Sequence, residues 1–109
     1  MTTTPIVLAQ AAFLGTTADA VYESTNCRTA IDKITATNRA ATNQTATVHI
    51  VPAGESAGES NAVSKLLAPG ESWTFPALVG HNLAPGDSIA PKASAVDSVW
   101  FRASGRQFT

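Results

Sequence analysis

The segment LLAPGESWTF spans residues 66–75, and NLAPGDSIAP follows at residues 82–91, so the hexad Leu-Ala-Pro-Gly-acid-Ser occurs twice in a chain of 109 residues. Proline pre-sets the backbone angle of the second position of a type II turn, and glycine adopts the positive φ of the third position. Each hexad therefore predicts the end of one strand, a turn and the start of the next strand. Gly70 and Gly86 should both have positive φ, and a helix at either position would contradict this interpretation.

The acidic residue of each hexad, Glu71 or Asp87, is expected at the mouth of a strand, where it accepts backbone N–H groups or stays in water. A phosphate-binding loop needs several glycines and a following helix with Lys and Ser or Thr, which neither hexad has. A calcium site needs six to eight converging oxygen atoms. The acids available, Glu55 and Glu59 with the two hexad acids, lack the alternating spacing of a calcium loop. We therefore expect no metal and no cofactor.

The segment QTATVHIV at residues 44–51 has the clearest strand pattern in the chain. Ala46, Val48 and Ile50 share one face, as expected of a strand with one buried side. The opposite face, predicted to be exposed, carries polar side chains: Thr45, Thr47 and His49.

The preceding segment, RTAIDKITATN at residues 28–38, is rich in β-branched residues and is also predicted to be a strand. Ile31 and Ile34 fall on opposite faces under strict alternation. One extra residue near Asp32 and Lys33 would reset the register, so we predict a β-bulge there. The Asn residues and small side chains between this strand and the next suit a hairpin loop.

Further strand patterns surround the hexads. Pro91 interrupts the alternation of residues 87–94, which predicts a sheet edge because proline donates no ladder hydrogen bond. In residues 98–105, Val99, Phe101 and Ala103 share the face predicted to be buried. The other predicted strands are residues 5–15, 19–24, 61–67 and 71–76, and residues 52–60 are predicted to be an exposed loop.

About seven or eight short strands, joined by turns rich in Gly, Pro and Asn, predict an all-β protein: a single antiparallel β-sandwich or jelly-roll-like domain. Residues 18–109 are assigned to this domain. Residues 1–17 are interpreted as either an N-terminal arm or the first strand. A chain of this length can bury its own core without a metal or a disulfide.

Charge is sparse and balanced. The chain has 7 basic and 8 acidic residues, a formal net charge of −1 and no run of either sign, which argues against a nucleic-acid partner. Residues 1–15 hold an apolar stretch that is too short for a membrane span and lacks the basic start of a signal peptide. We expect a protein made in the cytoplasm that binds neither nucleic acid nor membrane and packs against other subunits.

No catalytic constellation is apparent, so we predict that the protein is not an enzyme. His49 and His81, the two histidines, are both expected at the surface. No serine lies in a nucleophile-elbow pattern, and Cys27 has no recognisable Cys–His context. Cys27 is the single cysteine and is expected to be a buried or tolerated thiol. A small hydrolase with one of the histidines as its base is a minor alternative.

Four residues are predicted to contribute to a protein interface. Trp100 and Arg102 have the parity opposite to Val99, so they point outward if the Val99 face is the core. An exposed Trp beside an Arg is typical of interface hot spots, and partial burial of Trp100 under a loop is the alternative. Glu55 and Glu59 lie in the predicted exposed loop.

A carbohydrate- or cell-surface-binding module is a second functional class that the aromatic residues allow. Its stacking platform would be Trp100, Trp73 or Tyr22. Trp73 shares a face with Phe75, and we expect it in the core rather than at a binding site.

The order of motifs from about residue 29 to residue 106 resembles that of small β-structured proteins encoded among the structural genes of tailed bacteriophages. The resemblance is carried by three stretches: IDKITATNRAATNQTATVHIVPAGES, NAVSKLLAPGESWTF and LAPGDSIAPKASAVDSVWFRASG. It implies a virion component with a sandwich fold and supplies no catalytic residues. The N-terminal segment MTTTPIVLAQAAFLGTT departs from the pattern of the usual members.

The resemblance and the composition lead to one functional expectation. We expect a structural protein of the virion, a head decoration or cement protein that binds capsid subunits and forms a homo-oligomer. A component of the neck, the tail or the fibre attachment is the alternative within the same class.

Overall fold

The predicted strands are present, although the one expected at residues 19–24 is reduced to two residues, and a further two-residue strand, Asn82–Leu83, precedes the second hexad turn. The elements follow one another in the order β1 (Thr3–Phe13), β2 (Tyr22–Glu23), β3 (Arg28–Asn38), β4 (Gln44–Val51), η1 (Glu59–Asn61), β5 (Ala62–Leu67), β6 (Ser72–Thr74), η2 (Pro76–Leu78), β7 (Asn82–Leu83), β8 (Ser88–Ala93) and β9 (Val99–Phe108). The elements η1 and η2 are single turns of 3-10 helix.

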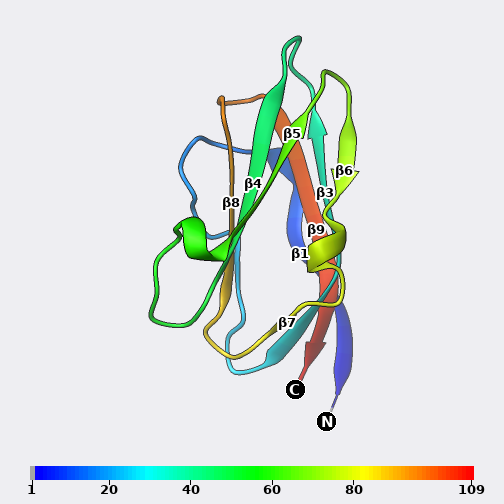
Figure 1. Cartoon of the computed structure of the whole chain (residues 1–109). Coiled ribbons are helices and arrows are strands. Elements are labelled where there is room, and N and C mark those ends of the chain that lie inside the picture. Colours follow the sequence, from blue (N-terminus) through cyan, green and yellow to red (C-terminus); the bar gives the residue numbers. More distant parts are fainter. Residues whose placement is uncertain (1) are drawn as a thin grey trace.

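Two antiparallel sheets face each other in this computed structural model, which describes residues 2–109 apart from the side chain of Glu59 (Figure 1). Sheet A has the strand order β1-β9-β3-β6, with β7 also paired to β3, and sheet B has the order β2-β8-β4-β5. The predicted all-β sandwich is confirmed. Within the described residues, no helix has the length and apolar character needed to cross a bilayer.

Residues 1–17, interpreted from the sequence as either an N-terminal arm or the first strand, contain β1. This strand pairs with β9 from Thr3 to Phe13 and forms one edge of sheet A. The chain ends meet beside it, because Thr2 and Thr109 exchange backbone hydrogen bonds. The N-terminal segment is therefore an integral part of the sandwich over its described length.

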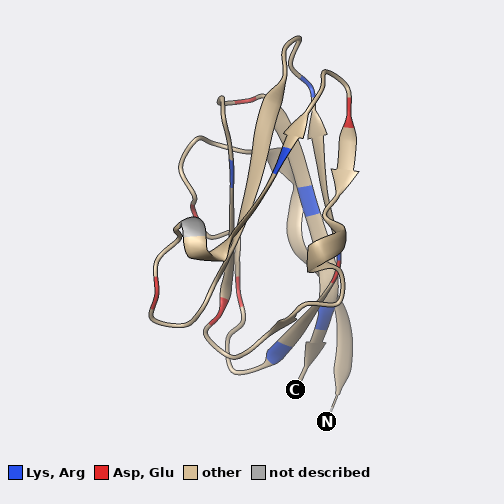
Figure 2. Cartoon of the chain, in the orientation of Figure 1, with Lys and Arg blue, Asp and Glu red and all other residues tan. Residues whose placement is uncertain are grey.

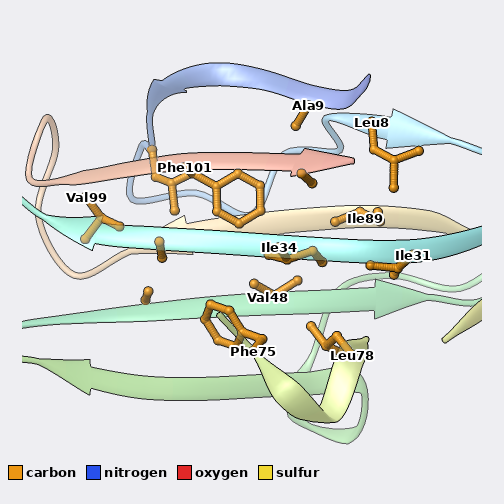
Figure 3. Packing of buried hydrophobic residues seen from close by; sticks show 14 of the residues in the cluster. Leu8, Ala9, Ile31, Ile34, Val48, Phe75, Leu78, Ile89, Val99 and Phe101 are labelled. Atoms are coloured by element: carbon orange, nitrogen blue, oxygen red, sulfur yellow. The ribbon is translucent and has the colours of Figure 1, made fainter. Parts of the chain in front are cut away.

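The core lies between the two sheets and draws one face from each long strand (Figure 3). β3 and β4 contribute Ile34 and Val48, which have no exposed surface. The predicted bulge is confirmed, because the register between β3 and β9 shifts between Ile31 and Lys33. The extra residue returns Ile31 to the buried face, where it also has no exposed surface.

The predicted hairpin between β3 and β4 is wrong. β3 belongs to sheet A and β4 to sheet B, so the connection crosses from one sheet to the other. The physical reason is that both strands have an apolar face, and each buries that face against the opposite sheet. Asn38 fixes the corner: its fully buried side chain donates from Nδ2 to the carbonyls of Thr42 and Leu67, and its Oδ1 accepts the N–H of Ala40.

Each hexad also carries the chain from one sheet to the other. The first leads from β5 in sheet B to β6 in sheet A, and the second leads from β7 in sheet A to β8 in sheet B. Gly70 has φ +80° and Gly86 has φ +94°, so the predicted positive φ is confirmed at both. The turns are therefore corners of the sandwich rather than hairpin loops within a sheet.

The first hexad makes a two-way backbone contact with the end of β3. Gly70 donates its N–H to the carbonyl oxygen of Asn38 at 2.9 Å. The N–H of Asn38 donates in turn to the carbonyl oxygen of Glu71, also at 2.9 Å. The Glu71 carboxylate closes the turn by accepting the N–H of Ala68 at 2.8 Å. These bonds continue the β3–β6 pairing, so the turn starts the strand that follows it.

The second hexad repeats this arrangement at the end of β2. Gly86 donates its N–H to the carbonyl of Ser24 at 2.6 Å, and Ser24 donates to the carbonyl of Asp87 at 2.9 Å. The Asp87 carboxylate accepts the N–H of Ala84 at 3.0 Å and, through its other oxygen, the N–H of Ala53 at 3.0 Å. Like Asn38, Ser24 is fully buried.

The prediction that β8 is an edge strand is wrong, but Pro91 itself does lie where β8 has a strand on one side only. β8 lies between β2 and β4. However, β2 reaches only Ser88 and Ile89 of β8, so none of the strands in the described part of the chain lies beside Pro91 on that side. Two residues further on, the N–H of Ala93 points the same way and donates to the carbonyl of Gly15 in a loop. The missing proline N–H therefore interrupts no ladder.

Both faces of β4 are covered, which contradicts the predicted exposure of His49. The loop between β4 and β5 folds over the outer side of β4, and His49 is only 4% exposed. Its Nδ1 lies 3.1 Å from the carbonyl oxygen of Gly58 and 3.0 Å from Oδ1 of Asn61. Because both partners are acceptors, Nδ1 carries the proton and donates. The imidazole therefore anchors the loop.

The two hexad glycines differ in their surroundings, and this allows a matched test. A Cβ at Gly70 would meet no atom within 4 Å, whereas a Cβ at Gly86 would lie 2.8 Å from the Cβ of Ala53. We expect Gly70→Ala to lower the free energy of unfolding by about 1 kcal/mol through the positive φ alone. Gly86→Ala should cost about 2–4 kcal/mol because overpacking is added. Urea titration followed by circular dichroism measures both, with Gly15→Ala as the unstrained control; equal losses at the two hexads would contradict the assignment.

The buried amide of Asn38 should be a stability determinant. Asn38→Ala leaves two carbonyls and one N–H at the corner without their side-chain partner, so we expect a loss of about 2–4 kcal/mol in the free energy of unfolding. Thr37→Ala is the neighbouring control, because the side-chain hydroxyl of Thr37 bonds to the exposed hydroxyl of Ser72, and it should cost less than about 1 kcal/mol. Chemical denaturation of both variants gives the comparison, and an Asn38 cost no larger than the Thr37 cost would show that the corner does not depend on the amide.

Candidate interaction surface

The outer face of sheet A carries the predicted interface residues of β9. Val99, Phe101 and Ala103 are buried, whereas Arg102 is exposed and Trp100 is half-buried. The predicted parity of β9 is therefore confirmed. Trp100 points away from the core and is partly covered by its neighbours on the same face.

Those neighbours come from two segments that sequence alternation does not connect to Trp100. Phe13 lies opposite Trp100 in the β1–β9 register, and their rings meet edge to face with centroids 4.8 Å apart. The guanidinium of Arg39 lies 5.6 Å from the Trp100 ring centroid, within the range of a cation–π contact. Since Phe13 is still 42% exposed, the three side chains form an aromatic cluster open to solvent.

The middle of the same face is hollowed beside β1. The β1–β9 register shifts between Val7 and Ala9 and again between Ala9 and Ala12, so β1 bulges as it passes β9. A hollow of about 410 Å³ lies over these bulges, and its wall includes Lys33 and Arg102. Val7, at 65% exposure, gives the hollow an apolar rim. We call this feature the β1–β3 hollow.

The far end of the face carries one ion pair, and the exposed Arg28 lies opposite Phe108 on the same face. Arg106 donates from Nε to Oδ1 of Asp32 at 3.0 Å, and both side chains are nearly half exposed. Arg106 also lies 5.9 Å from the Phe108 ring centroid. The bulge residue Asp32 thus neutralises one cation of the face, and an exposed pair of this kind contributes little to stability.

Acidic and basic residues are distributed differently over the fold (Figure 2). Six of the seven basic residues lie in strands, and six of the eight acidic residues lie outside strands. Two acids, Glu71 and Asp87, are used to cap the hexad turns. Basic charge is therefore offered by sheet faces, whereas the acids belong to loops and corners.

The structure does not bring all four predicted interface residues to one surface. Glu55 lies in the exposed loop between β4 and η1, beside sheet B, whereas Trp100 and Arg102 lie on the outer face of sheet A. The side chain of Glu59 lies outside the described residues. Sequence reasoning missed Phe13 and Lys33, because the bulges in β1 and β3 obscure which face each occupies. It also missed Arg39, which lies just past the end of β3, where alternation does not apply.

The other aromatic candidates for a stacking platform are engaged inside the fold. Tyr22 bonds through its hydroxyl to Oγ1 of Thr29 at 2.7 Å and accepts from Gln107 at 2.9 Å. Trp73 packs against the core, and the ammonium of Lys65 lies 4.6 Å from its ring centroid. The expectation that Trp73 belongs with the core is confirmed.

The remaining polar candidates are dispersed. His81 is exposed, as predicted, whereas His49 is buried and lines a different hollow. Cys27 is buried beside the hydroxyl groups of Ser24 and Thr29. Among the described residues, no three His, Cys, Asp or Glu side chains gather as a metal site would require.

Comparison with known proteins supplies no family for the chain. No protein-family model matches the sequence, and no curated protein matches it significantly.

Adjacent residues of β9 should differ sharply in their contribution to stability. Phe101→Ala removes a buried ring that is 2% exposed and should cost about 3–5 kcal/mol in the free energy of unfolding. Trp100→Ala removes the edge contact with Phe13, the cation–π contact with Arg39 and a partly buried ring, and should cost about 1–2 kcal/mol. Equilibrium unfolding measures both; a larger loss for Trp100 would place it in the core and remove it from the surface described above.

Proposed function

We propose that this protein is a non-enzymatic structural protein of a tailed-bacteriophage virion, and that it decorates the head by binding capsid subunits. Two observations support the proposal. The order of strands and turns from about residue 29 to residue 106 resembles that of small virion proteins. In addition, one sheet face carries uncovered aromatic, apolar and basic side chains in the combination that protein interfaces favour.

The single observation that carries the proposal is the cluster of Trp100, Phe13 and Arg39 on the outer face of sheet A. Aromatic rings and Arg are enriched in interface hot spots. The rings bury a large area with few rotatable bonds, and the guanidinium supplies several hydrogen-bond donors. The surrounding strands are held rigidly by β9, which pairs along most of its length with both β1 and β3. A face whose strands are paired on both sides of β9 is suited to binding another folded subunit.

Two alternative functions would use the same surface differently. A neck, tail or fibre-attachment component would use the same face on a different subunit. A carbohydrate-binding module would need a stacking platform, and of the three aromatic residues considered, Trp100 alone lies on an outer sheet face. Both outcomes can be distinguished in the experiment that tests head binding.

The test is binding of the purified protein to phage heads that lack it, followed by co-sedimentation, with mass spectrometry of intact particles to establish whether the protein is a component. We expect the protein in the particles and on the heads, and we expect Trp100→Ala combined with Arg39→Ala to weaken binding at least about tenfold. Lys92→Ala, on β8 of sheet B, is the control and should bind normally.

Absence from particles together with no binding to heads or tails would refute the proposal. Binding to isolated tails but not heads would move the protein to the alternative virion position. A glycan-array signal that Trp100→Ala abolishes, without particle binding, would support the carbohydrate-binding module instead.

A further inference from the structure

The β1–β3 hollow contains two cations that the fold leaves without a partner. Lys33 lies opposite Ser104 and Arg102 lies opposite Thr35 in the β3–β9 register, so both cations stand on neighbouring rows of the same face. Among the described residues, the single ion pair is that of Arg106 with Asp32. Lys33 and Arg102 are both exposed and line one hollow of about 410 Å³. Their charges are therefore available to an acidic group from outside the fold.

The hollow also contains an unused hydroxyl. Oγ1 of Thr35 is buried and has no hydrogen-bond partner among the described residues, although Thr35 lines the hollow. Because that oxygen is covered, recognition from outside falls to the exposed ammonium of Lys33 and guanidinium of Arg102, which donate charge-assisted hydrogen bonds to a carboxylate. The chemistry of the hollow thus favours a carboxylate, and the exposed side chain of Val7 offers an apolar contact beside it.

The chain presents such a carboxylate on the loop that follows β4. Glu55 closes a turn by donating its N–H to the carbonyl of Pro52 at 3.0 Å, and Gly54 has φ +81° in that turn. The turn is held in place because the N–H of Ala53 donates to the carboxylate of Asp87. There is no Lys or Arg between Arg39 and Lys65, so this exposed loop has only acidic charge.

A single molecule cannot make the contact with itself. The loop after β4 lies on the side of sheet B, away from β1 and β9 (Figure 1). We propose that the β1–β3 hollow of one copy binds the Glu55 loop of a second copy. Because the two surfaces are different, the contact is heterologous, and each copy can use its hollow with one neighbour and its loop with another. Copies joined in this way form a ring or an open chain.

Strand addition at β1 is the competing way to join two copies, and the edge is protected against it. Thr2 and Thr109 exchange both backbone hydrogen bonds, so by alternation Pro5 directs its missing N–H outward from the sheet. The two register shifts interrupt the rest of the edge. Proline and bulges are the devices by which edge strands avoid pairing with another chain, so the charged surfaces are the better candidates for self-association.

This inference rests on the proposed function, since it names the arrangement by which an assembly subunit contacts its own copies. It is tested by sedimentation velocity over a concentration series at low and high salt. We expect the wild-type protein to self-associate and salt to weaken the association, because the charges are exposed. Lys33→Ala with Arg102→Ala should weaken it at least about tenfold, and so should Glu55→Ala. Lys92→Ala should leave it unchanged.

A mixture of two variants distinguishes a heterologous contact from any other. The Lys33→Ala, Arg102→Ala protein keeps its Glu55 loop, and the Glu55→Ala protein keeps its hollow, so an equimolar mixture should form a one-to-one pair that grows no further. The substituted side chains are exposed, and circular dichroism with chemical unfolding verifies that each variant is folded.

A wild-type protein that stays monomeric at every concentration and salt, or variants that associate as well as wild type, would overturn the inference. A failure of this copy-to-copy contact can be distinguished from a failure of the proposed virion function. A monomer that still co-sediments with phage heads leaves the proposed function standing, whereas a self-associating protein that is absent from particles leaves only the copy-to-copy contact.

Discussion

The rest of the structure depends on the two-way backbone contact between each hexad turn and a buried polar residue. Gly70 and Glu71 contact Asn38, and Gly86 and Asp87 contact Ser24 in the same manner. In both cases the contacted residue lies at the end of the strand beside which the next strand must begin. The turn is thus hydrogen-bonded to the sheet that the next strand joins. These bonds set both the sheet and the pairing register of that next strand.

Several acidic side chains are engaged within the fold, which leaves particular basic side chains without an acidic partner. The hexad acids accept backbone N–H groups at the corners, and Asp32 pairs with Arg106 after the bulge in β3. Most of the remaining acids lie in loops, whereas Lys33 and Arg102 stand on a sheet face without an acidic partner among the described residues. A protein with nearly zero net charge therefore carries most of its basic residues on strands and most of its acidic residues in loops, which suits directional contacts between subunits.

Bulges connect the fold to the proposed surface. In β3 an extra residue keeps both isoleucines in the core and turns Lys33 outward. In β1 two register shifts separate the strand from β9 and open the hollow that Arg102 lines. The aromatic cluster at the end of the same face depends on the final register, which sets Phe13 beside Trp100. Small irregularities in pairing therefore decide the shape of the outer face.

The sequence by itself determined the all-β class, the long strands, the bulge in β3, the positive φ of the hexad glycines and the outward direction of Trp100 and Arg102. These features follow from side-chain alternation and from the local backbone preferences of Pro and Gly. Only the tertiary structure decided that the chain changes sheets after β3, that His49 is buried beneath a loop, and that Glu55 lies away from Trp100. The physical reason is that sheet membership and burial depend on which apolar faces meet across the core, and local alternation does not specify the partner.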